Sequence, residues 1–224
     1  MARLPRLLLP GEAHHLILRA HSGLGGAGIC ADAADRSACL AALQEAAAAE
    51  QVQIHAYALL PTELQLLATP EQADGLSRLV QALGRRYGGA YNRRHGRRGT
   101  LWDGRYRCAV VEPGVTRLNV LRLIDGLSAE PGVTSAGHHS GGARVTLLRD
   151  LPEIWALGNT PFEREAALRT LLAQGLPPDV ANGLRQAALG GWASGSAGFA
   201  AAVALACDRP ARPRPRGRPR STPG

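Results

Sequence analysis

The sequence predicts an α+β domain on an antiparallel sheet, followed by a helical C-terminal unit. Three observations carry this prediction: short alternating apolar runs occur near one another, patterns with one apolar helical face separate them, and the links are short. With 224 residues and 45% hydrophobic side chains, the chain is long enough for one full core and a smaller second unit.

The first elements follow from local patterns. HHLILR at residues 14–19 predicts a strand, and Asp32 is placed to cap a helix over residues 33–50. Residues 51–60 alternate, which predicts a half-buried strand with an inner face of Val52, Ile54, Ala56 and Ala58. Residues 63–69 predict a paired strand with Leu64, Leu66 and Ala68 inward.

A long helix is predicted next, over residues 74–94. Its apolar stripe consists of Leu76, Leu79, Val80, Leu83, Tyr87 and Tyr91, which leaves most of its arginines on the other side. Residues 102–112 predict a further strand, and residues 113–127 a further helix. We expect this sheet domain to cover residues 1–128.

The remaining chain divides into three parts. Residues 129–150 are rich in Gly, Ser and His and predict an irregular connector. Residues 151–206 predict a helical unit, in which Thr160 and Glu163 form a capping box with Pro161 at the first helical position. Residues 207–224 hold six arginines and five prolines against one acid, so we expect a disordered tail.

Composition also bears on the compartment. The four cysteines form no C-x-x-C pair and show no disulfide framework, as is usual in a reducing cytoplasm. No apolar run is long enough for a signal peptide or a transmembrane span. We therefore expect a cytoplasmic protein without a membrane partner.

The most distinctive segment is basic and aromatic. Residues 85–107 hold eight arginines, three tyrosines and one tryptophan against the single acid Asp103. Arginines bind phosphates and flat rings stack on unpaired bases, so we expect a nucleic-acid interface; a solvated basic face is the alternative. Phosphate contacts are predicted for Arg85, Arg86, Arg93, Arg94, Arg97, Arg98, Arg105 and Arg107. Base stacking is predicted for Trp102, as the most exposed of the rings Tyr87, Tyr91, Trp102 and Tyr106.

The tail contains a second candidate DNA contact. Residues 215–220 read PRGRPR, which includes the core of an AT-hook. Arg216 and Arg218 would then lie in a narrow A·T minor groove, where the glycine between them permits a close approach. General attraction to phosphates is the alternative.

Few residues suggest a metal site. Glu63 and Gln65 share one face of their strand, and their oxygens suit Mg²⁺ or Mn²⁺, but two ligands are too few and a solvent-facing strand is the alternative. The pairs His14-His15 and His138-His139 are adjacent in sequence. Neighbours in a strand point to opposite faces, so we expect these histidines at the surface or in supporting positions rather than as paired ligands.

The order of these pieces resembles the REP-associated tyrosine transposases, bacterial relatives of the single-tyrosine HUH transposases. The matching segments are ARLPRLLLPGEAHHLILR, IHAYALLP, LQLLATP, the run over residues 74–107, TPFEREAALRTLL, GGW and PRGRPR. The resemblance covers most of the chain outside residues 128–148. It implies a ferredoxin-like antiparallel sheet with helices on one face and the binding of palindromic hairpin DNA. It also implies a tyrosine that cuts one strand beside a divalent metal held by two histidines.

This chain departs from the family at the catalytic positions. The two metal histidines fall on Glu63 and Gln65, and the nucleophilic tyrosine falls on Leu123. The Asn-Pro that follows the tyrosine in the family is also missing. Because Leu123 continues an apolar helical stripe, nothing local requires a hydroxyl there.

The leading hypothesis is therefore a DNA-binding protein of this transposase family, with strand-transfer chemistry absent or impaired and no cofactor. In a second hypothesis activity survives, with Glu63 and Gln65 holding Mg²⁺ or Mn²⁺ and Tyr87 or Tyr91 as the nucleophile. A third is a non-functional remnant of a mobile element with a marginal fold. The sequence leaves the DNA target and the oligomeric state open.

Overall fold

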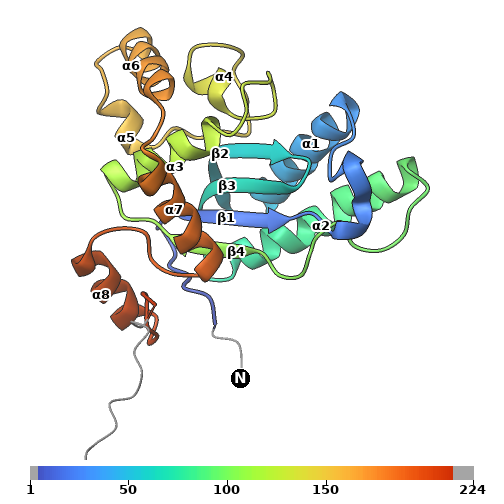
Figure 1. The fold of residues 1–224 in the computed structure, drawn as a ribbon, viewed down its shortest axis with the longest axis horizontal. Helices are drawn as coiled ribbons and strands as arrows, with labels where there is room; N and C mark the ends of the chain where they lie inside the picture. The colour runs from blue at the N-terminus through green and yellow to red at the C-terminus, as the bar shows by residue number, and fades with distance from the viewer. Residues whose placement is uncertain (1–4, 214–224) are drawn as a thin grey trace, which may run out of the picture.

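A four-stranded antiparallel sheet forms the centre of the computed structural model, which describes residues 5–213 (Figure 1). Its strands, in the spatial order β2-β3-β1-β4, are β1 (His14–Arg19), β2 (Val52–Leu60), β3 (Glu63–Pro70) and β4 (Arg107–Val110). Helix α1 (Ala33–Ala49) connects β1 to β2, and α2 (Gly75–Arg94) connects β3 to β4. This βαββαβ order confirms the predicted ferredoxin-like sheet.

Helices α1 and α2 cover one face of the sheet, as predicted. The Asp32 side chain caps α1 by accepting a hydrogen bond from the amide of Asp35. The predicted stripe of α2 packs against α1 and the strands; Val80 is half-buried, and Leu79, Leu83 and Tyr87 are at most 1% exposed. The helix continues without a break through Gly88 and Gly89. The apolar stripe therefore outweighs the low helix propensity of the two glycines.

The opposite face is covered by helices that follow β4. Helix α3 (Val115–Asp125) packs on β2 and β3, and α7 (Pro178–Gly190) packs on β4 and β1. Behind α3 lie the short α5 (Pro152–Trp155) and α6 (Pro161–Gln174), which begins with the predicted capping box. Leu67 of the sheet, Val120, Leu168 and Leu184 share the apolar cluster on this side. Both faces of the sheet are therefore buried.

The prediction for β2 is wrong in two respects. A β-bulge shifts the register between Ile54 and Ala56, so the two residues belong to the clusters on opposite faces of the sheet. The strand is also buried on both faces, with only Gln53 exposed, because α3 covers the face that was expected to meet solvent. Strict alternation in the sequence could not reveal the extra residue of the bulge.

The strand predicted over residues 102–112 is shorter than expected, since β4 begins at Arg107. Gly99 and Gly104 have φ angles of +93° and +65°, which turn the preceding chain into a loop. Within this loop Trp102 makes a single bridge with Ala20 beyond the end of β1. Because β4 is short, the end of the sheet lies open beside the arginines described below.

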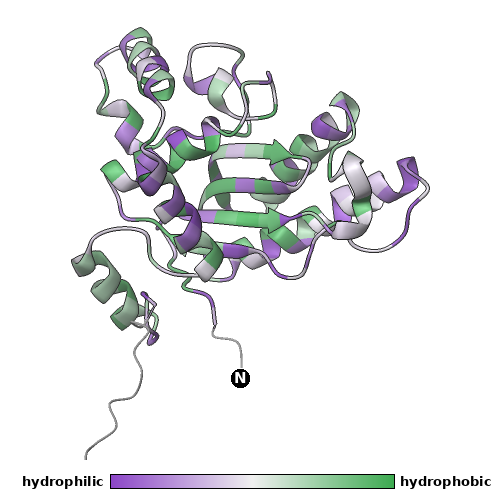
Figure 2. Cartoon of the chain, viewed as in Figure 1, coloured by the Kyte–Doolittle hydropathy of each residue, from purple (hydrophilic) through white to green (hydrophobic). Residues whose placement is uncertain are grey.

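Three further helices complete the described chain: the 3₁₀ helix η1 (Ser22–Ala27), α4 (Ala136–His139) and α8 (Ala197–Ala206). Helix α8 is hydrophobic along most of its length and lies apart from the sheet (Figure 2). Val203 of α8 packs with Leu7 near the N-terminus and with Val110 of β4. None of the helices among residues 5–213 has the length and apolar character to cross a bilayer.

Candidate nucleic-acid interface

The arginines of the basic segment lie on the outer side of α2 and in the loop that follows. Because the stripe of α2 faces the core, the other side of the helix carries Arg85, Arg86, Arg93 and Arg94, all exposed. Arg98 and Arg105 are exposed in the loop, and Arg97 is half-buried. The C-terminal end of α2 and the following loop are hydrophilic (Figure 2). The predicted basic surface therefore exists.

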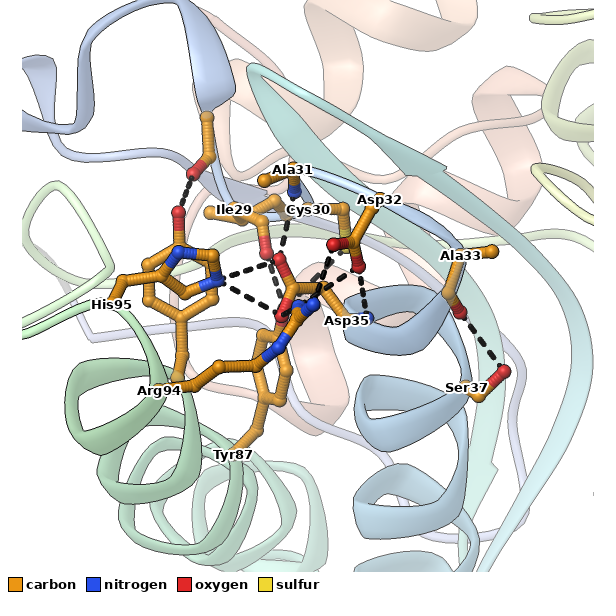
Figure 3. A network of polar contacts seen from close by, with 12 residues as sticks. Ile29, Cys30, Ala31, Asp32, Ala33, Asp35, Ser37, Tyr87, Arg94 and His95 are labelled. Atoms are coloured by element: carbon orange, nitrogen blue, oxygen red, sulfur yellow. Dashed lines mark hydrogen bonds and ion pairs between the residues drawn. The ribbon is translucent and has the colours of Figure 1, made fainter.

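Two of these arginines are already paired with acids. Arg86 Nη1 lies 2.8 Å from Glu45 Oε2 of α1, in an exposed ion pair. Arg94 donates to both Asp32 and Asp35 at the N-terminus of α1, each at 2.5 Å (Figure 3). The charge of Arg94 is thus balanced by two carboxylates, and its first role is to join α2 to α1.

Asp35 is the centre of this joint. Its carboxylate is 2% exposed and accepts from Arg94, from His95 Nε2 at 2.9 Å and from the amide of Ala31 at 2.9 Å (Figure 3). Burial opposes the charged form, but the bonds from His95, Ala31 and Arg94 outweigh it and lower the pKa of Asp35. The network holds the start of α1 against the end of α2.

Other arginines have no acid beside them. Within residues 5–213 no ion pair is formed by Arg85, Arg93, Arg97, Arg98 or Arg105. A cluster of exposed guanidinium groups without carboxylates raises the positive potential around it and attracts polyanions. These five residues therefore remain available for phosphate contacts.

Three neighbouring hollows surround the exposed end of β4. Their volumes are about 480, 230 and 220 Å³, and Arg105 lines all three. Arg6 and Tyr106 line the two larger hollows, and Arg19 lines the first and the third. Arg107 lines the second and the third. We call this region, lined by Arg6, Arg19, Arg105, Tyr106 and Arg107, the β4-edge surface.

Sequence reasoning missed three arginines of this region. Arg6 comes from the N-terminal segment, its guanidinium lies 3.7 Å from the centre of the Tyr106 ring, and it donates to the Tyr106 carbonyl. Arg19 is the last residue of β1, and Arg209 lies over Trp192 from the C-terminal side. Each is isolated from the basic segment in sequence, and only the fold brings them together. The sole local signal was the charge of each residue.

The aromatic side chains of the basic segment are buried. The Tyr87 hydroxyl donates to the Ile29 carbonyl and the Tyr91 hydroxyl to the Gly28 carbonyl at 2.9 Å. Tyr106 is 6% exposed, and Trp102 is 9% exposed. Trp102 is the most exposed of the four rings, but the expectation that it is open for base stacking is wrong, because it belongs to the apolar core cluster that α1 and α2 form with the sheet.

The position at which the resemblance implies metal ligands holds a buried ion pair. Glu63 is 6% exposed and Gln65 1% exposed, so the alternative of a solvent-facing strand is wrong. Arg185 of α7 donates to both oxygens of Glu63, at 2.6 and 2.8 Å. Gln65 donates to Glu63 at 2.5 Å and accepts from His15 Nε2 at 2.8 Å. A chain of contacts thus runs from β1 through β3 to α7.

These residues do not fit a divalent cation. Burial favours the neutral form of Glu63, but the guanidinium of Arg185 and the amide of Gln65 outweigh it and lower the pKa of Glu63. The carboxylate is therefore charged, and both its oxygens are occupied by hydrogen bonds from Arg185. A guanidinium stands where the resemblance places a metal ion.

The residues considered as nucleophiles, Leu123, Tyr87 and Tyr91, are likewise packed into the apolar clusters. Leu123 of α3 is half-buried and packs against the apolar cluster beneath that helix. Tyr87 and Tyr91 point into the cluster on the α1–α2 face, whereas Glu63 and Gln65 point to the other face, opposite Leu64 and Leu66. Burial also raises the pKa of Tyr87. The sheet separates the two groups that the second hypothesis combines.

The histidine pairs were expected at the surface or in supporting positions, and all four side chains are buried, so the surface placement is wrong. His14 and His15 are fully buried in β1, where they contact different partners. His138 and His139 lie in the short helix α4, so the argument from strand geometry does not apply to them. Within the described chain, His138, His139 and Asp150 form a group whose ligand atoms lie within 4.8 Å of one another. Arg216 and Arg218 lie outside the described residues.

Comparisons with known proteins identify the fold. No protein-family model matches the chain, and no curated protein sequence matches it. Among solved structures, a REP-associated tyrosine transposase bound to a REP hairpin is similar, with 12% identity and a TM-score of 0.50 over 68% of this chain and 93% of that one. A protein from Deinococcus radiodurans R1 described as a transposase has 20% identity and a TM-score of 0.38, over 58% of this chain and 100% of that one. The chain therefore has the fold of a REP-associated tyrosine transposase.

Proposed function

We propose that this protein is a REP-associated transposase-type protein that binds hairpin DNA and has lost the family's metal-and-tyrosine cleavage. The observation that carries the DNA-binding part is the β4-edge surface together with the arginines that lack acids on α2 and its loop. Within residues 5–213 these side chains come from five places in the chain: Arg6, Arg19, α2, its loop and β4. A polyanion that crosses this surface would replace many counterions at once.

The shared fold supports a DNA partner. The transposase with this fold was solved with a REP hairpin. In our proposal, phosphates lie along the outer side of α2 and reach Arg105 at the β4-edge surface, while Arg6 holds the loop at Tyr106. Recognition is mainly electrostatic, because the aromatic rings of the basic segment are in the core. Arg216 and Arg218 of the tail add a contact to an A·T-rich minor groove.

The salt bridge between Arg185 and Glu63 supports the loss of cleavage. A metal ion polarises the scissile phosphate and offsets charge in the transition state, and its site must keep open coordination positions. Here the carboxylate is fully engaged, and the hydroxyls of Tyr87 and Tyr91 lie on the other face of the sheet. The family's reaction therefore lacks both of its chemical groups in this chain.

A hairpin-binding titration tests the first part. We expect affinity for a labelled palindromic hairpin to fall steeply between about 50 and 200 mM salt, with a log–log slope that counts the phosphates contacted. A flat response over this range would refute the electrostatic account. Removal of residues 214–224 should weaken binding to hairpins with A·T-rich stems more than to G·C-rich ones, as a contact in the A·T minor groove requires.

A covalent-adduct assay tests the second part. The full chain is incubated with single-stranded hairpin substrates and Mg²⁺ or Mn²⁺, and adducts are separated on a denaturing gel. We expect none. An adduct that disappears in Tyr87→Phe or Tyr91→Phe would establish the active alternative and overturn this half of the proposal, while hairpin binding would stand independently.

A further inference from the structure

A second group of ionisable side chains lies at the junction of α4, α5 and α6 (Figure 1). A hollow of about 260 Å³ opens there, lined by His138, His139, Asp150, Trp155, Arg164 and Glu165 among others. None of these residues belongs to the basic surfaces or to the ion pair of Glu63. The hollow therefore requires its own explanation.

His139 has a fixed tautomer and an unused basic nitrogen. Its ring is buried at 3% exposure, and Nδ1 donates to Asp125 Oδ2 at 2.6 Å. Asp125 is held in turn by Ser135, whose hydroxyl donates to Oδ1 at 2.5 Å. The proton of the neutral ring is therefore on Nδ1, which leaves a lone pair on Nε2. That nitrogen is buried and has no hydrogen-bond partner within residues 5–213.

A buried hydrogen-bond acceptor without a partner lowers the stability of the folded protein by about 1–3 kcal/mol. His138, His139 and Asp150 each offer one ligand atom within 4.8 Å of the other two, and His138 Nε2 lies 3.6 Å from Asp150 Oδ1. Two imidazoles and a carboxylate form a donor set typical of zinc sites with an open fourth position. A carboxylate behind a ligating histidine, as Asp125 is behind His139, is the usual support of such a ligand.

His138 needs one adjustment to join this set. Its Nδ1 accepts a hydrogen bond from the amide of Val145 at 3.0 Å, so the proton of the neutral ring is on Nε2, which faces Asp150 at 3.6 Å. Ligation requires the proton to move to Nδ1 and the Val145 amide to turn away. The net proton count of the ring does not change. His139 and Asp150 require no such exchange and form the stronger half of the site.

We propose that His139, Asp150 and His138 bind a divalent transition-metal ion, with zinc as the best match. The two carboxylates Asp125 and Asp150 balance its charge, and the fourth position faces the hollow beside Glu165. In tetrahedral coordination the ligands approach to about 2.0–2.2 Å from the metal, so the three ligand atoms move closer together on binding. This site is independent of the proposed DNA binding.

Metal titration of the full, tag-free chain tests the proposal. We expect one equivalent of Zn²⁺ by calorimetry, and a visible absorption band with Co²⁺ that is typical of tetrahedral coordination. His139→Gln should weaken binding at least 100-fold. Asp125→Asn, which removes only the support, should weaken it about 10- to 100-fold. His21→Gln is the matched control, because His21 is exposed and the hydrogen bond that its side chain accepts within residues 5–213 comes from the Gly23 amide of the same turn; we expect no change.

Asp150→Asn provides a second variant should His139→Gln fail to fold, since Asp150 is exposed and its only polar side-chain contact among the described residues is His138. We expect it to bind Zn²⁺ at least tenfold more weakly with an unchanged circular dichroism spectrum. Wild-type protein without a Co²⁺ band, or variants that bind both metals as tightly as the wild type, would overturn the site.

Discussion

Arg185 and Arg105 are the same kind of side chain in opposite situations. Arg185 donates two hydrogen bonds to a carboxylate that is 6% exposed, and so becomes part of the interior of the fold. Arg105 is exposed, lines three hollows and forms no ion pair within residues 5–213. The difference lies in the neighbouring acid. A count of arginines therefore overstates the charge that is available to a ligand.

The comparison extends to the basic segment itself. Arg94 closes a network around the buried Asp35, whereas Arg93, its neighbour in sequence, has no acid beside it in the described chain. Adjacent residues on a helix point about 100° apart, so one can meet α1 while the next meets solvent. Interior polar groups and surface charges can thus be separated by experiment, and four predictions do so, ordered by the size of the effect.

The largest effect is expected from acid, through the buried histidines of the interior. Burial lowers the pKa of His14, His15 and His55 to about 4, below their ordinary value of 6.5. As pH falls, the unfolded chain therefore binds these protons before the folded chain does. The contribution of the three neutral histidines to the free energy of unfolding is fully present above pH 6.5 and is lost as pH falls toward 4. With all three contributing, the free energy of unfolding drops by up to about 4 kcal/mol per pH unit.

Urea unfolding at pH 7, 6 and 5 measures this dependence. His55→Gln should reduce the slope by about one third, since one of three protons is removed. His21→Gln, which changes an exposed histidine, should leave it unaltered. Equal stability at pH 7 and pH 5 would contradict the assignment of the interior histidines as neutral.

The second effect concerns the ion pair at the sheet. Arg185→Met leaves the buried carboxylate of Glu63 without its partner and should lower the free energy of unfolding by about 2–3 kcal/mol. This is less than for a fully buried pair, because the Arg185 side chain is 34% exposed. The double variant Glu63→Gln/Arg185→Met should recover to within about 1 kcal/mol of the wild type. No recovery would mean that α7 packing, and not the charge, is responsible.

The third effect concerns the surface charges. Arg93→Ala, Arg98→Ala and Arg105→Ala combined should weaken hairpin binding about 10- to 100-fold near 0.1 M salt and reduce the salt slope by about 3. The matched control is Arg36→Ala, Arg86→Ala and Arg144→Ala, which removes the same charge from arginines that are paired with Glu130, Glu45 and Glu165. We expect the control to change the slope by less than one. Equal losses would show that net charge alone matters.

The smallest effect is expected at the α1–α2 joint. Asp35→Ala removes the common acceptor of Arg94, His95 and the Ala31 amide, and should cost about 1–2 kcal/mol of unfolding free energy. Glu45→Ala, which removes the exposed partner of Arg86, should cost less than about 0.5 kcal/mol. Similar urea midpoints for the two variants would remove the distinction between interior and surface acids.

The sequence alone predicted the positions of those helices and strands whose defining pattern lies within one or two turns of chain. Periodicity and caps placed β1, α1 and α2 within a residue or so, because Asp32 and the apolar stripe act within one or two turns. The bulge in β2 was missed, since an extra residue leaves no mark in a short alternating run. The burial of its outer face was missed as well, because the covering helix α3 comes about 60 residues later.

The candidate sites show the same division. The outward arginines of α2 followed from the helical stripe, and the replacement of the metal histidines followed from the resemblance. The partner of Glu63 could not be predicted, because Arg185 lies 122 residues away in a helix with no other basic residue. The unpartnered Nε2 of His139 could not be predicted either. It depends on the hydrogen bond from His139 Nδ1 to Asp125, which forms because the chain turns between α3 and α4.

The contact between Arg185 and Glu63 also limits how this chain could change. The resemblance places the metal histidines of the transposase family at positions 63 and 65. Glu63→His alone would leave a guanidinium facing an imidazole, and Arg185→Met alone would strand a buried carboxylate. Each of these two single changes therefore passes through a less stable protein, while the two changes together need not. A laboratory selection for a metal-binding pair at these positions would have to change residues 63 and 185 together, or begin from a strongly stabilised parent.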